Sequence, residues 1–231
     1  MTSIKVQKPS VRKREAIEGA LLDAAERLFS ERAVEAVSMR EIAVAAGTTN
    51  HFAVQHYFKN KDELIRAIFR RRAVSIEGQR SARLAALSEA GKPLDTRNLL
   101  EVMFLPVIEE LDRQGNRSYA RFLLRIMWAN PYMQIREEMN EHFPMSNYVS
   151  TLLCRSLPGI STELFAARLS ASASLFLHAT LNWEHGGGGW RSSYADFNEA
   201  VADALEMAAA ALEAQVSFAG NRAAPGSPTH P

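Results

Sequence analysis

Apolar side chains recur at three- and four-residue spacing along almost the whole chain, which is the period of an amphipathic helix. In the first such stretch, residues 11–30, the positions Ile17, Leu21, Ala24 and Leu28 fall on one helical face. No segment shows the strict apolar–polar alternation of a half-buried strand. The pattern therefore predicts an all-α protein of about ten helices.

Capping residues and helix breakers divide this pattern into elements. Ser38 with Glu41, and Asn60 with Glu63, have the spacing of helix-starting capping boxes. We expect helices over residues 11–30, 39–46, 51–58, 61–87, 96–112, 117–129, 132–142, 146–156, 162–184 and 193–215. The tail, residues 216–231, is rich in Gly, Pro and Ser, so we expect it to be disordered.

Composition narrows the class of protein mainly by exclusion. Hydrophobic residues make up 47% of the 231 positions and charged residues 23%, as in soluble globular proteins. A single cysteine, Cys154, excludes an intramolecular disulfide and a zinc site with several thiolates. No apolar run approaches the ~18 residues of a membrane helix, and no secretory signal is evident. We expect a cytoplasmic protein with no membrane partner.

Charge is distributed unevenly along the chain. Residues 1–75 carry a net charge of +5 and residues 76–231 a net charge of −4, although the whole chain has only +1. A basic N-terminal third on an acidic remainder is typical of a nucleic-acid-binding end joined to a part that binds something else.

The segment 38–64 contains two short predicted helices joined by a tight turn at Gly47. This is the arrangement of a helix-turn-helix, whose second helix enters the major groove of DNA. Amide and imidazole side chains suit base edges, and lysines suit phosphates. The residues that we expect at DNA are Ser38, Thr48, Thr49, Asn50, His51, Phe52, Gln55, His56, Tyr57 and Lys61. On pattern alone, the alternative is a helical hairpin with polar turns.

The stretches S-M-R-E-I-A-V-A-A-G and H-Y-F-K-N-K-D-E-L-I, after an amphipathic first helix, resemble the TetR family of bacterial transcriptional regulators. The resemblance covers roughly residues 12–70. The family commonly has ten steps from the turn glycine to the phenylalanine, whereas Gly47 to Phe58 spans eleven, and Gln55 replaces a common phosphate-binding tyrosine. The role of docking in the DNA groove can therefore be transferred from the family to this sequence, but the contacts of individual residues before Val54 cannot.

The resemblance implies a DNA-binding domain over residues 11–60 and an effector-binding and dimerisation domain over residues 61–215. Such a protein binds a palindromic double-stranded DNA operator as a homodimer, and a small-molecule effector releases it. Small residues on the last two long helices fit a dimer contact: Ala166, Ala167, Ser170, Ala171, Ala173, Ala200, Ala204, Ala208 and Ala211. The alternative is that these helices pack within a monomer.

Polar or bulky side chains on apolar helices are candidates for the effector site. We select Met103, Phe104, Arg121, Arg125, Trp128, Phe176, His178 and Trp183. The alternatives are plain core for the apolar members and a solvent edge for the arginines. The expected effector is a hydrophobic or aromatic compound, with a hydrophobic acid, a steroid and an acyl thioester all left open. No histidine pair has a dedicated metal spacing, so we expect neither metal nor cofactor.

Two other functions compete with that of a ligand-responsive repressor. An all-α enzyme using Glu and His groups of the C-terminal part would need a catalytic motif, and none is present, so we do not expect an enzyme. A protein that coats DNA without sequence preference would need a larger basic excess than +5.

Overall fold

The computed structural model describes residues 9–50, 52–127, 129–184 and 193–216. Within these ranges the chain forms ten α-helices, two short 3-10 turns and no strand, which confirms the all-α prediction. The first elements are α1 (Pro9–Glu31), η1 (Val34–Ala36), α2 (Met39–Ala45), α3 (Ala53–Phe58) and α4 (Lys61–Glu89). The others are α5 (Thr96–Glu109), α6 (Ser118–Ile126), α7 (Asn130–Met139), η2 (Asn140–His142), α8 (Pro144–Ser156), α9 (Thr162–Glu184) and α11 (Phe197–Glu213).

Most predicted helix bounds lie within two or three residues of the observed ones. The largest differences have local causes. The segment predicted as a helix over 193–215 becomes helical only at Phe197, because the Asp196 carboxylate accepts the backbone N–H of Glu199 and caps the helix there. The segment predicted over 132–142 divides into α7 and η2, and η1 was not predicted at all.

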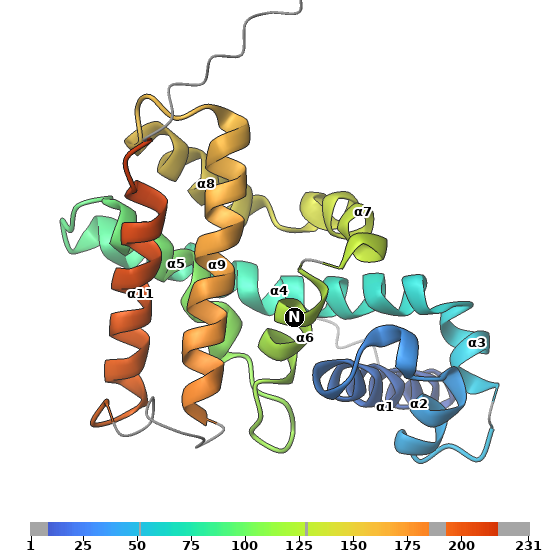
Figure 1. The fold of residues 1–231 in the computed structure, drawn as a ribbon. Helices are drawn as coiled ribbons and strands as arrows, with labels where there is room; N and C mark the ends of the chain where they lie inside the picture. Colours follow the sequence, from blue (N-terminus) through green and yellow to red (C-terminus); the bar gives the residue numbers. More distant parts are fainter. Residues whose placement is uncertain (1–8, 51, 128, 185–192, 217–231) are drawn as a thin grey trace, which may run out of the picture.

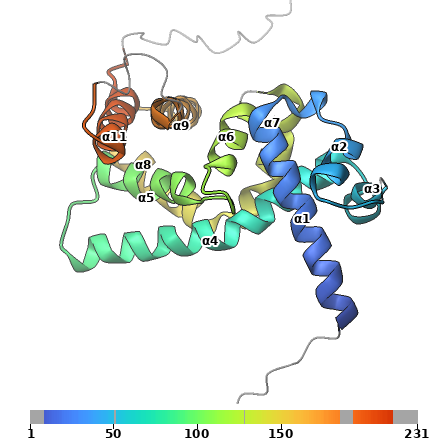
Figure 2. The same cartoon turned by 90° about the horizontal axis from the view of Figure 1, so that it is seen from below.

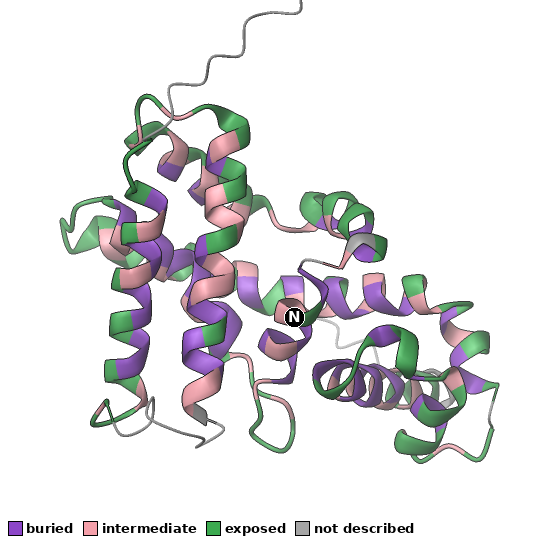
Figure 3. Cartoon of the chain, viewed as in Figure 1, coloured by how far each residue is buried: buried purple, intermediate pink, exposed green. Residues whose placement is uncertain are grey.

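The helices form two groups, joined by α4. We call α1, η1, α2 and α3 the head, and α5 to α11 the body. The head lies at one end of the molecule, and the α9–α11 pair lies at the other (Figure 1). Seen from below, α4 runs along one edge from the body to the head (Figure 2). Helix α6 of the body also packs on α1. Buried positions follow stripes along the helices, as the sequence pattern predicts (Figure 3).

The head has its own apolar core, to which all its elements contribute. Fully buried members are Leu21, Ala25, Phe29, Val37, Ile42, Ala43 and Val54, and Leu64 at the start of α4 is also fully buried. An aromatic cluster continues this core into the body, because the Phe122 ring lies 6.2 Å from that of Phe29 and 5.8 Å from that of Phe69. The head and the body are therefore joined by apolar packing as well as by the chain.

The alanines of α11 lie where two helices of one chain meet. Ala200, Ala204 and Ala208 are buried, and α11 packs along α9. This replaces the sequence-based placement of these three residues in a dimer contact. By contrast, Ala166, Ala167 and Ala171 of α9 are exposed.

Helix α9 also contains a stretch that is long and apolar enough to span a membrane. Among the described residues only Thr162–Trp183 meets that description, and 39% of its most apolar window is buried inside the protein. Within the chain, α9 packs on α11, α6 and α5.

A buried carboxylate joins three helices, α1, α4 and α6, at the junction of the head with the body. Glu26 of α1 is 1% exposed and accepts two hydrogen bonds from Arg72 of α4, at 2.6 and 2.8 Å. Arg71 and the Ser118 hydroxyl donate to the same carboxylate. Arg72 also donates to Glu110, the residue that follows α5. We call Glu26, Arg71, Arg72, Glu110 and Ser118 the junction network.

We predict that Glu26→Gln lowers the free energy of unfolding by about 3–5 kcal/mol, because it leaves the desolvated Arg72 guanidinium without its main counter-charge. Equilibrium urea unfolding would measure this. The matched control is Arg27→Gln, which removes an exposed pair with Glu31 at 3.7 Å and should cost under about 1 kcal/mol. Equal effects of the two substitutions would contradict a special role for the junction network.

Candidate DNA interface and effector pocket

Helix α2 begins at a complete capping box. The Ser38 hydroxyl accepts the N–H of Glu41 at 3.1 Å, and the Glu41 carboxylate accepts the N–H of Ser38 at 2.7 Å. Arg32 also donates to Glu41 at 3.1 Å. The pKa of Glu41 is lowered to about 2, mainly by the hydrogen bond from the Ser38 backbone N–H. The hydrogen bonds that involve the Ser38 and Arg32 side chains lower it further. Ser38, predicted at DNA, therefore fixes the start of α2.

The turn between α2 and α3 is held by its own polar side chains. Gly47 has φ of +72°, a conformation that a residue with a Cβ rarely adopts. The Thr48 hydroxyl accepts a hydrogen bond from the backbone N–H of Asn50 at 3.2 Å. The side-chain Oδ1 of Asn50 accepts one from the backbone N–H of Phe52 at 3.0 Å. Thr49 is exposed, and the Phe52 side chain, 72% exposed, projects at the start of α3. The predicted residue His51 lies outside the described residues.

Helix α3 has one buried and one exposed side. Val54 and Phe58 pack into the head core, whereas Gln55 and His56 are exposed. Tyr57 is half-buried, with the Arg14 guanidinium of α1 5.8 Å from the centre of its ring. The amide and the imidazole are thus presented on the face that a second helix of this motif turns toward base edges.

The structure also distinguishes among the cations of the head. The Lys61 ammonium group donates to the carbonyls of Val34 and Glu35, at 2.8 and 3.2 Å, so it anchors η1 to the start of α4. A phosphate contact by Lys61 stays a prediction. Arg40 is exposed in the first turn of α2 and was missed from the sequence, although it stands in the S-M-R-E motif.

These features define the class of the head: α1 supports a helix-turn-helix made of α2, its turn and α3. Residues 21–68 match the family model described as "Bacterial regulatory proteins, tetR family". The match assigns residues 21–68 to the DNA-binding domain of this family, and the chain is therefore a DNA-binding transcriptional regulator. No curated protein matches the chain at a significant level. The match ends early in α4, so it does not describe the body.

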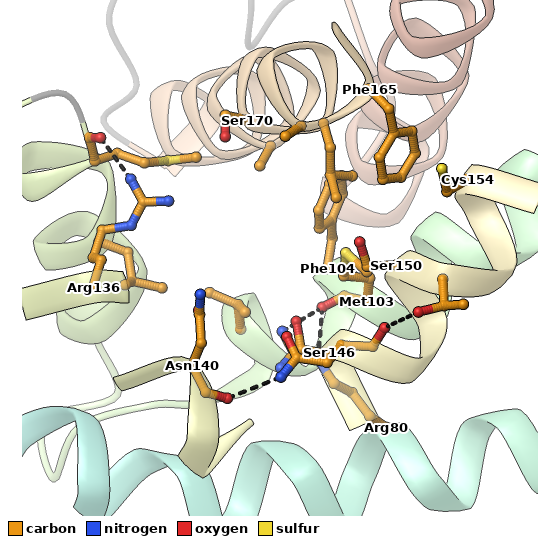
Figure 4. A pocket seen from close by; sticks show the side chains of 18 of the residues that line it. Arg80, Met103, Phe104, Arg136, Asn140, Ser146, Ser150, Cys154, Phe165 and Ser170 are labelled. Carbon is orange, nitrogen blue, oxygen red and sulfur yellow. Dashed lines mark hydrogen bonds between the residues drawn. The ribbon is translucent and has the colours of Figure 1, made fainter. Parts of the chain in front are cut away.

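The body contains a cavity of about 680 Å³. Helices α4 to α9 all contribute to it, and the labelled side chains in Figure 4 converge on it from several of them. Apolar lining comes from Met103, Phe104, Val107, Leu123, Met127, Phe165, Ala166, Leu169, Ala173 and Leu177. Polar lining comes from Arg80, Arg136, Asn140, Ser146, Asn147, Ser150, Thr151, Cys154, Arg155, Thr162 and Ser170. The size and the mixed lining are typical of small-molecule sites.

Two of the predicted effector-site residues, Met103 and Phe104, line this cavity. Phe176 is buried behind them, its ring stacked at 5.3 Å from that of Phe104. His178 is exposed, and Trp183 packs against the Phe197 ring at 5.3 Å. None of these last three residues is part of the lining, and Trp128 lies outside the described residues.

The predicted arginine pair of α6 lies away from the cavity. Arg125 donates to the carbonyls of Ser30 and Glu31 at 2.7 and 2.8 Å, so it satisfies the C-terminal end of α1. Arg121 is half-buried, and burial, together with nearby Arg125, lowers its pKa. Neither side chain lines the cavity, and a contact of either one with the effector stays a prediction.

The arginines that do line the cavity come from α4, α7 and α8. Arg80 is 6% exposed and follows Ala73 and Ile76 on the buried stripe of α4, a position at which an arginine is unusual. The spacing of Arg80 from these apolar residues could have indicated from the sequence that its side chain is buried. Arg136 lies in a largely polar helix, where nothing in the sequence distinguishes it from a solvated side chain.

Metal ligands do not cluster in the part of the chain that the structure describes. No group of three or more His, Cys, Asp or Glu side chains there could hold an ion. Glu138, which stands four residues before His142, accepts hydrogen bonds from Arg66 of α4 at 2.7 and 3.1 Å.

We predict that Glu41→Gln lowers the urea midpoint at pH 7, because it removes the charge that accepts from Ser38 and Arg32. The pKa of Glu41 in the folded protein, about 2, lies below its ordinary value of 4.5. The stabilisation is therefore fully present above about pH 4.5 and is lost as the pH falls toward 2. The difference between the two proteins should narrow from pH 7 to pH 3. A constant difference would contradict this assignment.

Proposed function

We propose that this regulator is a cytoplasmic, homodimeric repressor that a small hydrophobic or aromatic effector releases from a palindromic operator. In this proposal residues 11–60 bind DNA, residues 61–215 bind the effector and form the dimer, and residues 216–231 are a tail. The observation that carries the proposal is a helix-turn-helix with an exposed α3 face, joined by one continuous helix to a cavity of about 680 Å³.

Helix α4 is the element that joins the two sites. It begins at Lys61, whose ammonium group holds η1 of the head, and it contributes Arg80 to the cavity. Nineteen residues of helix separate these positions by about 28 Å at 1.5 Å per residue. A small tilt of α4 at the cavity end would therefore displace α3 at the other end.

The dimer contact is proposed on the exposed side of the α9–α11 pair. The small side chains Ala167 and Ala171 leave this side of α9 open to close approach by a second helix. A two-fold axis there would place two heads on successive major grooves, about 34 Å apart. Release follows when an effector changes that spacing.

The experiment that tests this function is selection of bound fragments from the source genome, followed by footprinting of the best fragment at two salt concentrations. A palindromic footprint that persists at the higher salt supports the repressor. Binding that ignores sequence and disappears at moderate salt would contradict it, because phosphate contacts alone give that behaviour.

We predict that Gln55→Ala weakens binding to the selected operator by about 5- to 150-fold, the loss of one base contact. Binding to unrelated DNA should be unchanged. The control, Gln134→Ala, alters an exposed side chain of α7 that only reaches Glu138 of the same helix, and it should leave both affinities unchanged. Fluorescence anisotropy at fixed salt measures both. An equal loss on operator and unrelated DNA would show that Gln55 does not read sequence.

A further inference from the structure

The charged side chains that line the cavity are all of one sign. Its described lining includes three arginines, Arg80, Arg136 and Arg155, and no aspartate or glutamate. This occurs although residues 76–231 carry a net charge of −4. The cavity is therefore a positive site within an acidic part of the chain, which favours an anionic ligand.

The three arginines are not equivalent. Arg80 is neutralised inside the protein, because it pairs with Glu77 at 2.7 Å and donates twice to the Met103 carbonyl. Arg155 is exposed at the end of α8, where water solvates its charge. Arg136 is half-buried and donates to the Met127 carbonyl at 2.7 Å.

Arg136 is the half-buried cavity arginine that has no close ion pair among the described residues, and the neighbouring Glu137 carboxylate offsets only part of its charge from beyond ion-pair distance. Within the described residues no carboxylate lies within 4 Å of its guanidinium. Burial lowers its pKa, which shows that the surroundings disfavour the charged form. A guanidinium has five N–H donors in a planar fork, and the Met127 carbonyl engages one nitrogen. The others can receive a carboxylate in the bidentate geometry that arginine favours.

The rest of the cavity is suited to an apolar ligand body. In Figure 4, Arg136 lies at one side of the cavity, and Phe165 and Cys154 lie at the other, with Phe104 and Met103 between. A ligand that pairs with Arg136 would thus extend along aromatic and thioether surface, which adapts to varied shapes.

We infer that the cavity binds a hydrophobic monocarboxylate, with its carboxylate on Arg136 and its alkyl or aryl body along Met103, Phe104 and Phe165. This inference rests on the proposed function, since it names the chemical class of that effector. It limits the effector to an acid, and it assigns the ionic contact to Arg136 of α7 in place of the arginines of α6.

The test is calorimetric titration of the full chain, without DNA, with octanoate, decanoate, dodecanoate and 2-naphthoate, each beside its primary amide. At least one carboxylate should bind tenfold or more tightly than its amide. Arg136→Met should weaken that carboxylate by about 10- to 100-fold, the range of a charge-assisted hydrogen bond, and leave the amide unchanged. Arg136→Lys, which keeps the charge and loses the fork, should lie between.

The control variant is Lys92→Gln, which removes one positive charge from an exposed turn outside the cavity and should bind like the wild type. Thermal unfolding of each variant checks that loss of the Met127 contact has not unfolded the body. The inference is overturned if no carboxylate exceeds its amide, if Arg136→Met weakens both equally, or if Arg155→Met alone abolishes the preference.

The proposed function is tested separately, by adding each probe to the complex of the protein with its operator and measuring release of the DNA. If an amide releases the operator and no carboxylate binds preferentially, the proposed function stands and this inference fails. If a carboxylate binds through Arg136 without changing operator affinity, the inference stands and the ligand-responsive part of the proposed function fails.

Discussion

The buried carboxylate of Glu26 is the constraint on which the arrangement of head and body depends. A buried charge is costly unless it is fully hydrogen-bonded, and Glu26 meets this condition only when α1, α4 and α6 meet at one place. Apolar packing around Phe69 and Phe122 would allow a range of helix positions. The junction network, with fixed donor geometry, selects one of them.

The same helix continues this constraint into the cavity. Five residues after Arg72, the Glu77 carboxylate accepts backbone N–H groups at the start of α8, and it also pairs with Arg80. Arg80 in turn holds the Met103 carbonyl of α5, close to Pro106, which interrupts the hydrogen bonding of that helix. Residues of α5 and α8 that line or adjoin the cavity are therefore held by side chains of α4, the helix that leads to the head.

The local features of this protein could be predicted from its sequence, and the long-range ones could not. Helix positions follow from periodicity and caps such as Ser38 with Glu41, because both depend on residues three or four positions apart. The helix-turn-helix could be found for the same reason. Arg125 was placed at the effector because it stands on an apolar helix, but its partners are carbonyls of α1 some 94 and 95 residues away. Nothing in α6 alone reveals them.

The cavity shows the same limit more clearly. Six helices contribute to its wall, and only their packing brings Arg80 and Arg136 to one space. Likewise, the alanines of α11 have the spacing of a dimer contact, but Ala204 and Ala208 are buried within the chain, where α11 packs on α9 and α5. A stripe of small residues indicates close helix approach without identifying the partner.

The most direct test of the central claim, that the cavity and the DNA-binding face are coupled through α4, is a reciprocal binding measurement. The affinity of the tightest-binding cavity probe, whether acid or amide, would be measured by calorimetry with and without saturating operator at fixed salt. Coupling free energies of the usual size predict that the operator weakens probe binding by about 5- to 150-fold. Equal affinities in the two conditions would contradict the account, because the two sites would then be independent.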